Sequence, residues 1–109
     1  MDAEEIVERQ LERYNAHDLD GFAACYAEDV EIFAFGSKEP ELKGIEALRT
    51  RYAERFRNEG LRARIASRIV KGAVVIDDER VEGLGPATLS VVAIYETAKG
   101  KIARVTLIR

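Results

Sequence analysis

The sequence is poor in the residues that build metal centres and covalent cross-links. It has one cysteine, one histidine and no tryptophan. A single cysteine cannot form an internal disulfide, which fits a reducing compartment, so we expect a cytoplasmic protein. A lone histidine argues against the multi-histidine sites of zinc and non-haem iron, so we expect no metal site. Cys25 is expected to be a small buried hydrophobe.

The chain also lacks long apolar runs, phosphate-binding loops and an excess of positive charge. No stretch is long and apolar enough to span a bilayer, so no membrane association is expected. The net charge of −3 argues against a nucleic-acid partner, because such binding depends on neutralising phosphates. Gly83-Leu84-Gly85 joins two predicted strands and opens no helix, and we expect no cofactor.

What remains is the composition of an ordinary globular protein. Hydrophobic residues make up 47% and charged residues 34% of the chain, and 109 residues suit a single domain, 1–109. Helical spacing of apolar residues predicts three helices, at 3–16, 19–27 and 45–58. An extended segment is predicted at 30–35, and alternation then predicts four strands, at 64–70, 73–81, 87–97 and 101–108. This order predicts an α+β fold with the helices on one face of an antiparallel sheet.

The register of the first hairpin decides which side chains a ligand would meet. A two-residue turn at Lys71-Gly72 gives the more apolar inner face, which carries Ile65, Ser67, Ile69, Val74, Ile76 and Asp78. A slip of one residue would instead turn Asp77 and Glu79 inward. The later strands complete the inner wall with Leu89, Val91, Ala93, Tyr95, Ala103, Val105 and Leu107.

Asp78 is the leading candidate for catalysis on this wall. A carboxylate flanked by Ile76, Val91 and Ala93 would lose hydration, which raises its pKa toward the range of acid–base chemistry. The alternatives are a solvated aspartate near the sheet edge and a partner of Arg80.

Several other residues on the inward surfaces are candidates for ligand contact. Tyrosines project from the apolar stripes of the first and third helices and from the inner wall, where their hydroxyls could converge on a ligand oxygen. Ordinary core packing is the alternative for each of them. The predicted contacts are Tyr14, Tyr52, Phe56, Ser67, Val91 and Tyr95.

The stretch YNAHDLDGFAACYAEDVEI, residues 14–32, resembles the opening of the nuclear transport factor 2-like superfamily. It is similar to the small-molecule branch, which comprises the ketosteroid isomerases and the SnoaL-like polyketide cyclases. GIEALRTRY (44–52) and KGKIARV (99–105) fall where that family places its third helix and last hairpin. The resemblance implies a cone-shaped roll, in which a curved sheet wraps a long helix, with a pocket at the open end and a homodimer.

The same resemblance implies which positions line the pocket, but the residues at these positions do not fit the isomerase reaction. Aligned on the Asp-Leu-Asp corner, the isomerase tyrosine falls at Gln10, the proton-shuttling aspartate at Ala34 and the oxyanion-stabilising acid at Ala93. Alanine can neither move a proton nor stabilise an enolate, so this chain should not be a ketosteroid isomerase by the usual residues.

Two functions of different class remain open. One is a cofactor-free isomerase, lyase, cyclase or hydrolase that acts on a small apolar carbonyl or polyketide-like compound, with Asp78 as acid–base and a tyrosine or Gln10 as donor. The other is a non-catalytic ligand-binding or dimerisation domain. The expected partners are a small apolar ligand and a second copy of the chain, because the outer sheet face mixes charges with Val75, Val92, Ile94, Ile102 and Ile108.

Overall fold

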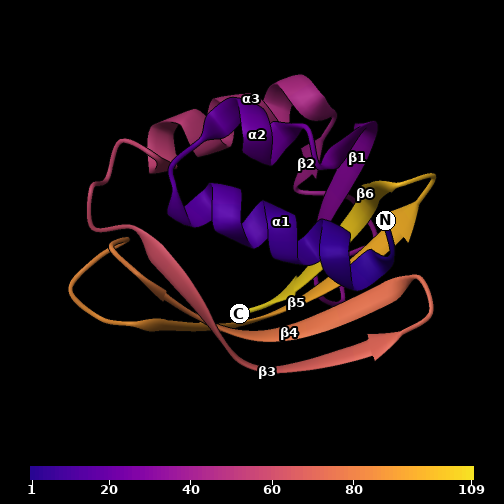
Figure 1. Cartoon of the computed structure of the whole chain (residues 1–109). Coiled ribbons are helices and arrows are strands. Elements are labelled where there is room, and N and C mark those ends of the chain that lie inside the picture. The colour runs from indigo at the N-terminus through magenta and orange to yellow at the C-terminus, as the bar shows by residue number, and fades with distance from the viewer.

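The computed structural model describes all 109 residues as three helices on one side of a curved six-stranded sheet (Figure 1). The helices are α1 (Ala3–Asn15), α2 (Leu19–Ala23) and α3 (Ile45–Arg55). The strands are β1 (Tyr26–Ala34), β2 (Leu42–Lys43), β3 (Arg62–Lys71), β4 (Val74–Glu82), β5 (Leu89–Ala98) and β6 (Lys101–Ile108). The predicted α+β fold is confirmed. The sheet order is β2-β1-β6-β5-β4-β3, and the sheet is mixed because β1 runs parallel to β6.

Helix α1 begins at a capping box and lays one face on the sheet. The Asp2 carboxylate accepts from the Glu5 amide at 2.9 Å, and the Glu5 carboxylate accepts from the Asp2 amide at 3.3 Å. The buried face of α1 carries Ala3, Ile6, Val7, Gln10 and Tyr14. Helix α2 is shorter than predicted, because β1 already pairs with β6 at Tyr26.

An aromatic cluster centred on Phe22 joins the helices to the sheet. The Phe22 ring centroid lies 4.7 Å from that of Tyr52, 5.0 Å from Tyr26, 5.4 Å from Phe56 and 5.9 Å from Tyr14. All five rings belong to, or pack against, the main hydrophobic core. Contacts of this kind hold the three tyrosine rings in defined orientations.

The first hairpin has a different register from the predicted one, and its other face, not the predicted apolar one, packs against the helices. The turn is Gly72-Ala73, so that Lys71 pairs with Val74 and Arg68 with Asp77. Gly72 has φ +56°, which glycine adopts readily at the first position of a tight hairpin turn. The pairing differs from the predicted one by two residues, which keeps Arg68 on the same face as Asp77. The alternative orientation is nevertheless the observed one: Asp77 and Glu79 face the helices, whereas Asp78 faces outward.

The choice of inward face also changes the predicted β3 contacts. An irregularity between Ile65 and Ser67 follows the register change, and Ser67 pairs with Asp78 on the outer face. The inward placement predicted for Ser67 and Ile69 is thus wrong, and Ile69 is 62% exposed. On β5 and β6 the predicted inner residues Ala93, Tyr95 and Val105 are buried. Ile102 is also buried, because the pairing shifts after Glu96.

A buried ion pair fastens α1 to the sheet. Arg68 donates from Nε to Asp77 Oδ1 at 2.7 Å and from Nη2 to Oδ2 at 3.0 Å. Its third donor, Nη1, reaches Glu8 of α1 at 2.8 Å. The Asp77 side chain is fully buried, so this pair lies at the inner junction of β3, β4 and α1.

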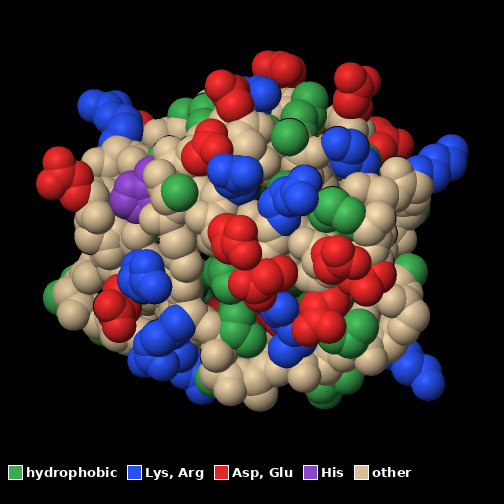
Figure 2. All heavy atoms as spheres, viewed as in Figure 1, with side chains coloured by type: hydrophobic (Ala, Val, Ile, Leu, Met, Phe, Trp, Pro, Cys, Tyr) green, Lys and Arg blue, Asp and Glu red, His purple; other side chains and the backbone are tan.

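Acidic and basic side chains are interspersed over the side of the molecule seen in Figure 2. None of the three helices has the length and apolar character needed to cross a membrane.

Candidate functional site

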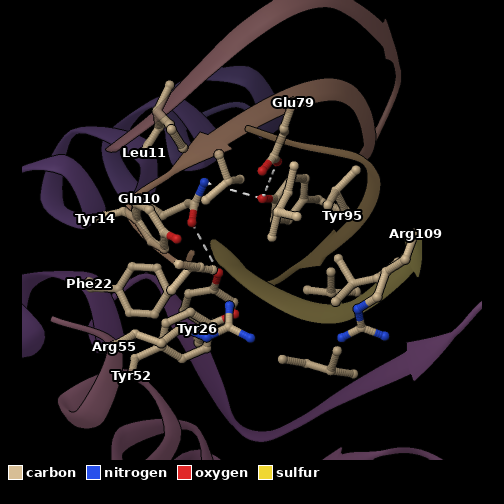
Figure 3. A pocket seen from close by; sticks show the side chains of 18 of the residues that line it. Gln10, Leu11, Tyr14, Phe22, Tyr26, Tyr52, Arg55, Glu79, Tyr95 and Arg109 are labelled. Atoms are coloured by element: carbon tan, nitrogen blue, oxygen red, sulfur yellow. Dashed lines mark hydrogen bonds between the residues drawn. The ribbon is translucent and has the colours of Figure 1, made fainter. Parts of the chain in front are cut away.

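A cavity of about 270 Å³ lies between the concave face of the sheet and the helices (Figure 3). Most of its wall is apolar, with Leu11, Val81, Leu89, Val91 and Val105 among the lining residues. The polar residues that reach it are Gln10, Tyr14, Tyr26, Tyr52, Arg55, Glu79, Ser90, Tyr95 and Arg109. A mainly apolar wall with a few polar groups is typical of small-molecule sites.

Glu79 supplies a carboxylate to the cavity from the middle of β4. Burial raises the pKa of Glu79 to about 7, against the lowering effect of a hydrogen bond from Tyr95. Tyr95 donates to Glu79 Oε2 at 2.9 Å. The other oxygen, Oε1, has no hydrogen-bond partner in the protein. Every buried side-chain oxygen and nitrogen of the chain does have a partner, so Oε1 must be accessible. Glu79 therefore presents one free carboxylate oxygen to the cavity.

A chain of hydrogen bonds orients Glu79 from behind. The Tyr26 hydroxyl donates to Gln10 Oε1 at 3.0 Å, and Gln10 Nε2 donates to the Tyr95 hydroxyl at 3.4 Å. The Tyr95 hydroxyl then donates to Glu79 (dashed lines, Figure 3). All donors point the same way, from β1 through α1 and β5 to β4. Burial raises the pKa of both tyrosines well above the usual value, so they remain protonated donors at neutral pH.

Two further hydroxyls line the cavity without being used in the fold. The Tyr52 hydroxyl has no hydrogen-bond partner in the chain, and only Arg55 approaches the hydroxyl of Tyr14. Neither hydroxyl is buried without a partner, so both are accessible. Burial raises the pKa of Tyr14 to about 12. Both tyrosines therefore stay protonated at neutral pH and can donate to an oxygen of a bound molecule.

Residues 7–105 match the family model of the SnoaL-like domain. The chain belongs to this family. A similar solved structure is an uncharacterised cystatin-fold protein from Novosphingobium aromaticivorans, with 24% identity and a TM-score of 0.87 over 100% of this chain and 99% of that one. A candidate polyketide cyclase from Sinorhizobium meliloti has 19% identity and a TM-score of 0.77, covering 94% and 93%. A candidate ketosteroid isomerase from Kribbella flavida has 20% identity and a TM-score of 0.80, covering 95% and 74%. A search of curated proteins finds no match.

The SnoaL-like domain brings together about half of the predicted site residues. Gln10, Tyr14, Tyr52, Val91 and Tyr95 line the cavity. The other predicted contacts do not: Ala34, Phe56, Ser67 and Ala93. Ala34 lies at the end of β1, and Phe56 packs among the aromatic rings and stacks on His17. Ala93 is buried on β5, where it pairs with Asp77, whereas the cavity-lining Val91 pairs with Glu79.

Asp78 does not lie where the sequence placed it. Its carboxylate pairs with the Arg80 guanidinium on the outer side of β4, and both side chains are about one-third exposed. The inward orientation predicted for Asp78 is wrong, because the opposite face of β4, with the buried Val75, Asp77 and Val81, packs against the helices. The neighbouring Glu79 takes the position on the cavity wall.

Three cavity residues were not among the predicted contacts: Tyr26, Arg55 and Arg109. Tyr26 was assigned to a helix, whereas it begins β1. Arg55 follows Tyr52 by three positions on α3, and this helical spacing is the signal that could have indicated a shared face. No group of three or more histidine, cysteine, aspartate or glutamate side chains is placed to hold a metal ion.

Proposed function

We propose that this SnoaL-like domain binds a small, mainly apolar carbonyl compound and transfers a proton on it, as a cofactor-free isomerase, lyase or cyclase. The observation that most supports this proposal is the Glu79 carboxylate, which has a pKa of about 7 and lies on an apolar wall. One of its oxygens accepts a hydrogen bond from Tyr95. Fold neighbours described as a candidate polyketide cyclase and a candidate ketosteroid isomerase support this reaction class.

The proposed step begins at the free oxygen of Glu79. A carboxylate with a pKa near neutrality is partly ionised at pH 7 and is basic enough to accept a proton from carbon beside a carbonyl. The C–H bond breaks, the proton moves to Glu79, and the electron pair passes to the carbonyl oxygen. The Tyr14 and Tyr52 hydroxyls are the available donors to that oxygen. Return of the proton to a different carbon completes an isomerisation.

The cavity volume limits the size of the substrate. At roughly 30 Å³ for each water-sized atom, a volume of about 270 Å³ holds on the order of ten non-hydrogen atoms. This suits a single ring with a short side chain. Alanines occupy the positions that align with the two isomerase acids, at 34 and 93. Glu79 would therefore provide the base from another strand.

Proton exchange on a simple ketone tests this role. We expect the chain to accelerate deuterium incorporation beside the carbonyl of propiophenone in heavy water, as followed by NMR. Glu79→Gln should lower the rate by about 100-fold or more, because the base is lost. The rate of the unaltered chain should rise with pH and level off above about 7, because Glu79 must be ionised to accept the proton.

Asp78→Asn is the matched control, since it removes the adjacent carboxylate on the outer face. It should leave the exchange rate and its pH profile unchanged. Equal rates for Glu79→Gln and the unaltered chain would refute the role of Glu79. Binding of ketones without any exchange, across a panel of aryl ketones, would favour a non-catalytic binding domain.

We further propose that two copies of the chain associate through the outer face of the sheet. Ile69, Ile76 and Ile94 form a row across β3, β4 and β5. Val92 and Ile108 pair beside them on β5 and β6, and Ile108 is 37% exposed. Partly exposed apolar side chains in adjacent strands, rather than scattered singly, are typical of an interaction surface.

Light scattering at micromolar concentration should give the mass of a dimer. Ile76→Glu, at the centre of the row, should give a monomer, because the new carboxylate would be buried without a partner. Val70→Glu is the control: Val70 is 43% exposed and lies on the opposite face of β3. Circular dichroism checks that both variants fold. A monomeric unaltered chain would contradict the proposal.

A further inference from the structure

The guanidinium of Arg55 lines the cavity without a carboxylate partner. The arginines around it are paired: Arg51 and Arg109 with Glu41, Arg57 with Glu54, and Arg68 with Asp77. Arg55 forms no ion pair, and its guanidinium lies over the Tyr52 ring, 5.1 Å from the centroid. A half-buried cation beside an apolar wall is stabilised when an anion reaches it.

Arg55 and Glu79 lie on different sides of the cavity. Figure 3 shows the Arg55 guanidinium beside Tyr26 and Tyr52, whereas Glu79 lies beyond Gln10 and Tyr95. Tyr14 is close enough to both charges for each to affect its pKa. Burial and Tyr52 raise this pKa most, Arg55 lowers it, and Glu79 raises it. The free hydroxyl of Tyr14 therefore lies where it could contact the middle of a molecule that spans the two charged groups.

We propose that Arg55 binds a carboxylate of the substrate, an inference that rests on the proposed function. The substrates would then be small apolar carboxylic acids that also carry a carbonyl group. The planar guanidinium matches a carboxylate in a two-point hydrogen bond, and an apolar surrounding strengthens the attraction. Holding the acid at Arg55 directs the carbonyl end of a short molecule toward Tyr14 and Glu79. It also keeps the negative charge of the substrate away from the Glu79 carboxylate.

Arg109 is the other cation at the cavity, and its geometry excludes it as the anchor. Its Nη1 and Nη2 donate to the two oxygens of Glu41, both at 2.8 Å. The hydrogen bonds from Arg109 lower the pKa of Glu41 to about 2, so Glu41 stays ionised and holds Arg109 at neutral pH. Binding a substrate acid through Arg109 would require breaking this two-point pair, whereas Arg55 has no such pair to break.

Binding of a matched acid and amide tests the anchor. Phenylacetate and phenylacetamide have the same shape and about ten non-hydrogen atoms, which suits the cavity. Titration at about pH 6 keeps the acid ionised, and chemical shifts of the lining residues report binding in the cavity. We expect phenylacetate to bind about 10- to 100-fold more tightly than the amide. Arg55→Gln should abolish this preference, so that the two probes bind with about equal affinity.

Two further variants complete the test. Arg55→Lys keeps a charge and should retain part of the preference, whereas Arg57→Gln removes an exposed arginine nearby and should retain all of it. Equal affinities for the two probes, or a preference that survives Arg55→Gln, would overturn the anchor. Either result leaves the ketone exchange by Glu79 intact as a separate finding. If neither probe binds and ketone exchange is also absent, both proposals fail.

Discussion

Asp77→Asn is expected to destabilise the chain by about 3 kcal/mol, because it leaves the guanidinium of Arg68 buried without its main counter-charge. Asp77 is fully buried and accepts two hydrogen bonds from Arg68, whose side chain is 14% exposed. The remaining bond from Arg68 to Glu8 keeps the loss at the lower end of the range for broken buried pairs. Urea denaturation should show a lower midpoint with an unchanged slope.

Asp78→Asn provides the control for this measurement as well. It breaks the ion pair with Arg80 on the outer face, where solvent screens both charges, so it should cost clearly less than Asp77→Asn. A cost for Asp77→Asn no larger than that for Asp78→Asn would contradict the argument. Replacing Arg68 with Met and Asp77 with Leu together should recover most of the loss, because an apolar pair needs no counter-charge.

The Arg68–Asp77 pair also matters for the site. It fastens α1, through Glu8, to β3 and β4, and α1 carries Gln10 and Tyr14 of the cavity wall. Asp77 is two residues from Glu79 on the same face of β4, and its negative charge helps to raise the pKa of Glu79. The positive charge of Arg68 lowers that pKa, so the two charges of the pair act on Glu79 in opposite directions.

Much of the fold could be predicted because its signals are local. The spacing of Ile6, Val7 and Tyr14 indicates the buried face of α1, and all three are buried. The change to alternating residues after Gly60 indicates the four-stranded meander. β2 was missed, since two residues are too few to show a period. The pairing of β1 with β6 brings together residues far apart in the sequence, which no local pattern encodes.

The candidate site could not be predicted in the same way, because it depends on which face of the first hairpin packs against the helices. The turns Lys71-Gly72 and Gly72-Ala73 place the same residues on each face, so the turn does not decide whether Asp78 or Glu79 faces inward. The apolar pattern favoured the wrong choice, because the outer face carries Ile69 and Ile76. A partly exposed apolar face therefore resembles a core face in the sequence.

The hydrogen bonds behind Glu79 are equally invisible in the sequence. Tyr26, Gln10, Tyr95 and Glu79 come from four different elements, and Gln10 and Tyr95 are 85 positions apart. The resemblance placed Gln10 at the cavity, but it could not supply the partners of its amide. Because the same fold can carry different chemistry at different positions, the carboxylate has to be found in the structure itself.

Gly83→Ala is expected to destabilise the chain by about 2 to 5 kcal/mol, through a contact between two loops at the cavity. Gly83 has φ +93°, and a Cβ there would lie 2.5 Å from backbone atoms of Gly60 and Leu61. The loops cannot separate cheaply, because Leu61 is 2% exposed and its carbonyl bonds to His17 at 2.8 Å. Thermal unfolding should show the loss as a lower midpoint.

The comparison with Gly36→Ala separates the contact from the backbone strain. Gly36 has a similar φ of +86°, but no heavy atom lies within 4 Å of the position of its Cβ. Gly36→Ala should therefore cost only the strain of the left-handed conformation, about 1 to 2 kcal/mol. Leu84, which follows Gly83, lines the cavity, so Gly83→Ala should also weaken binding of propiophenone, whereas Gly36→Ala should not. Equal losses of stability in the two variants would show that the loops separate without cost and that the Gly60–Gly83 approach does not fix the cavity wall.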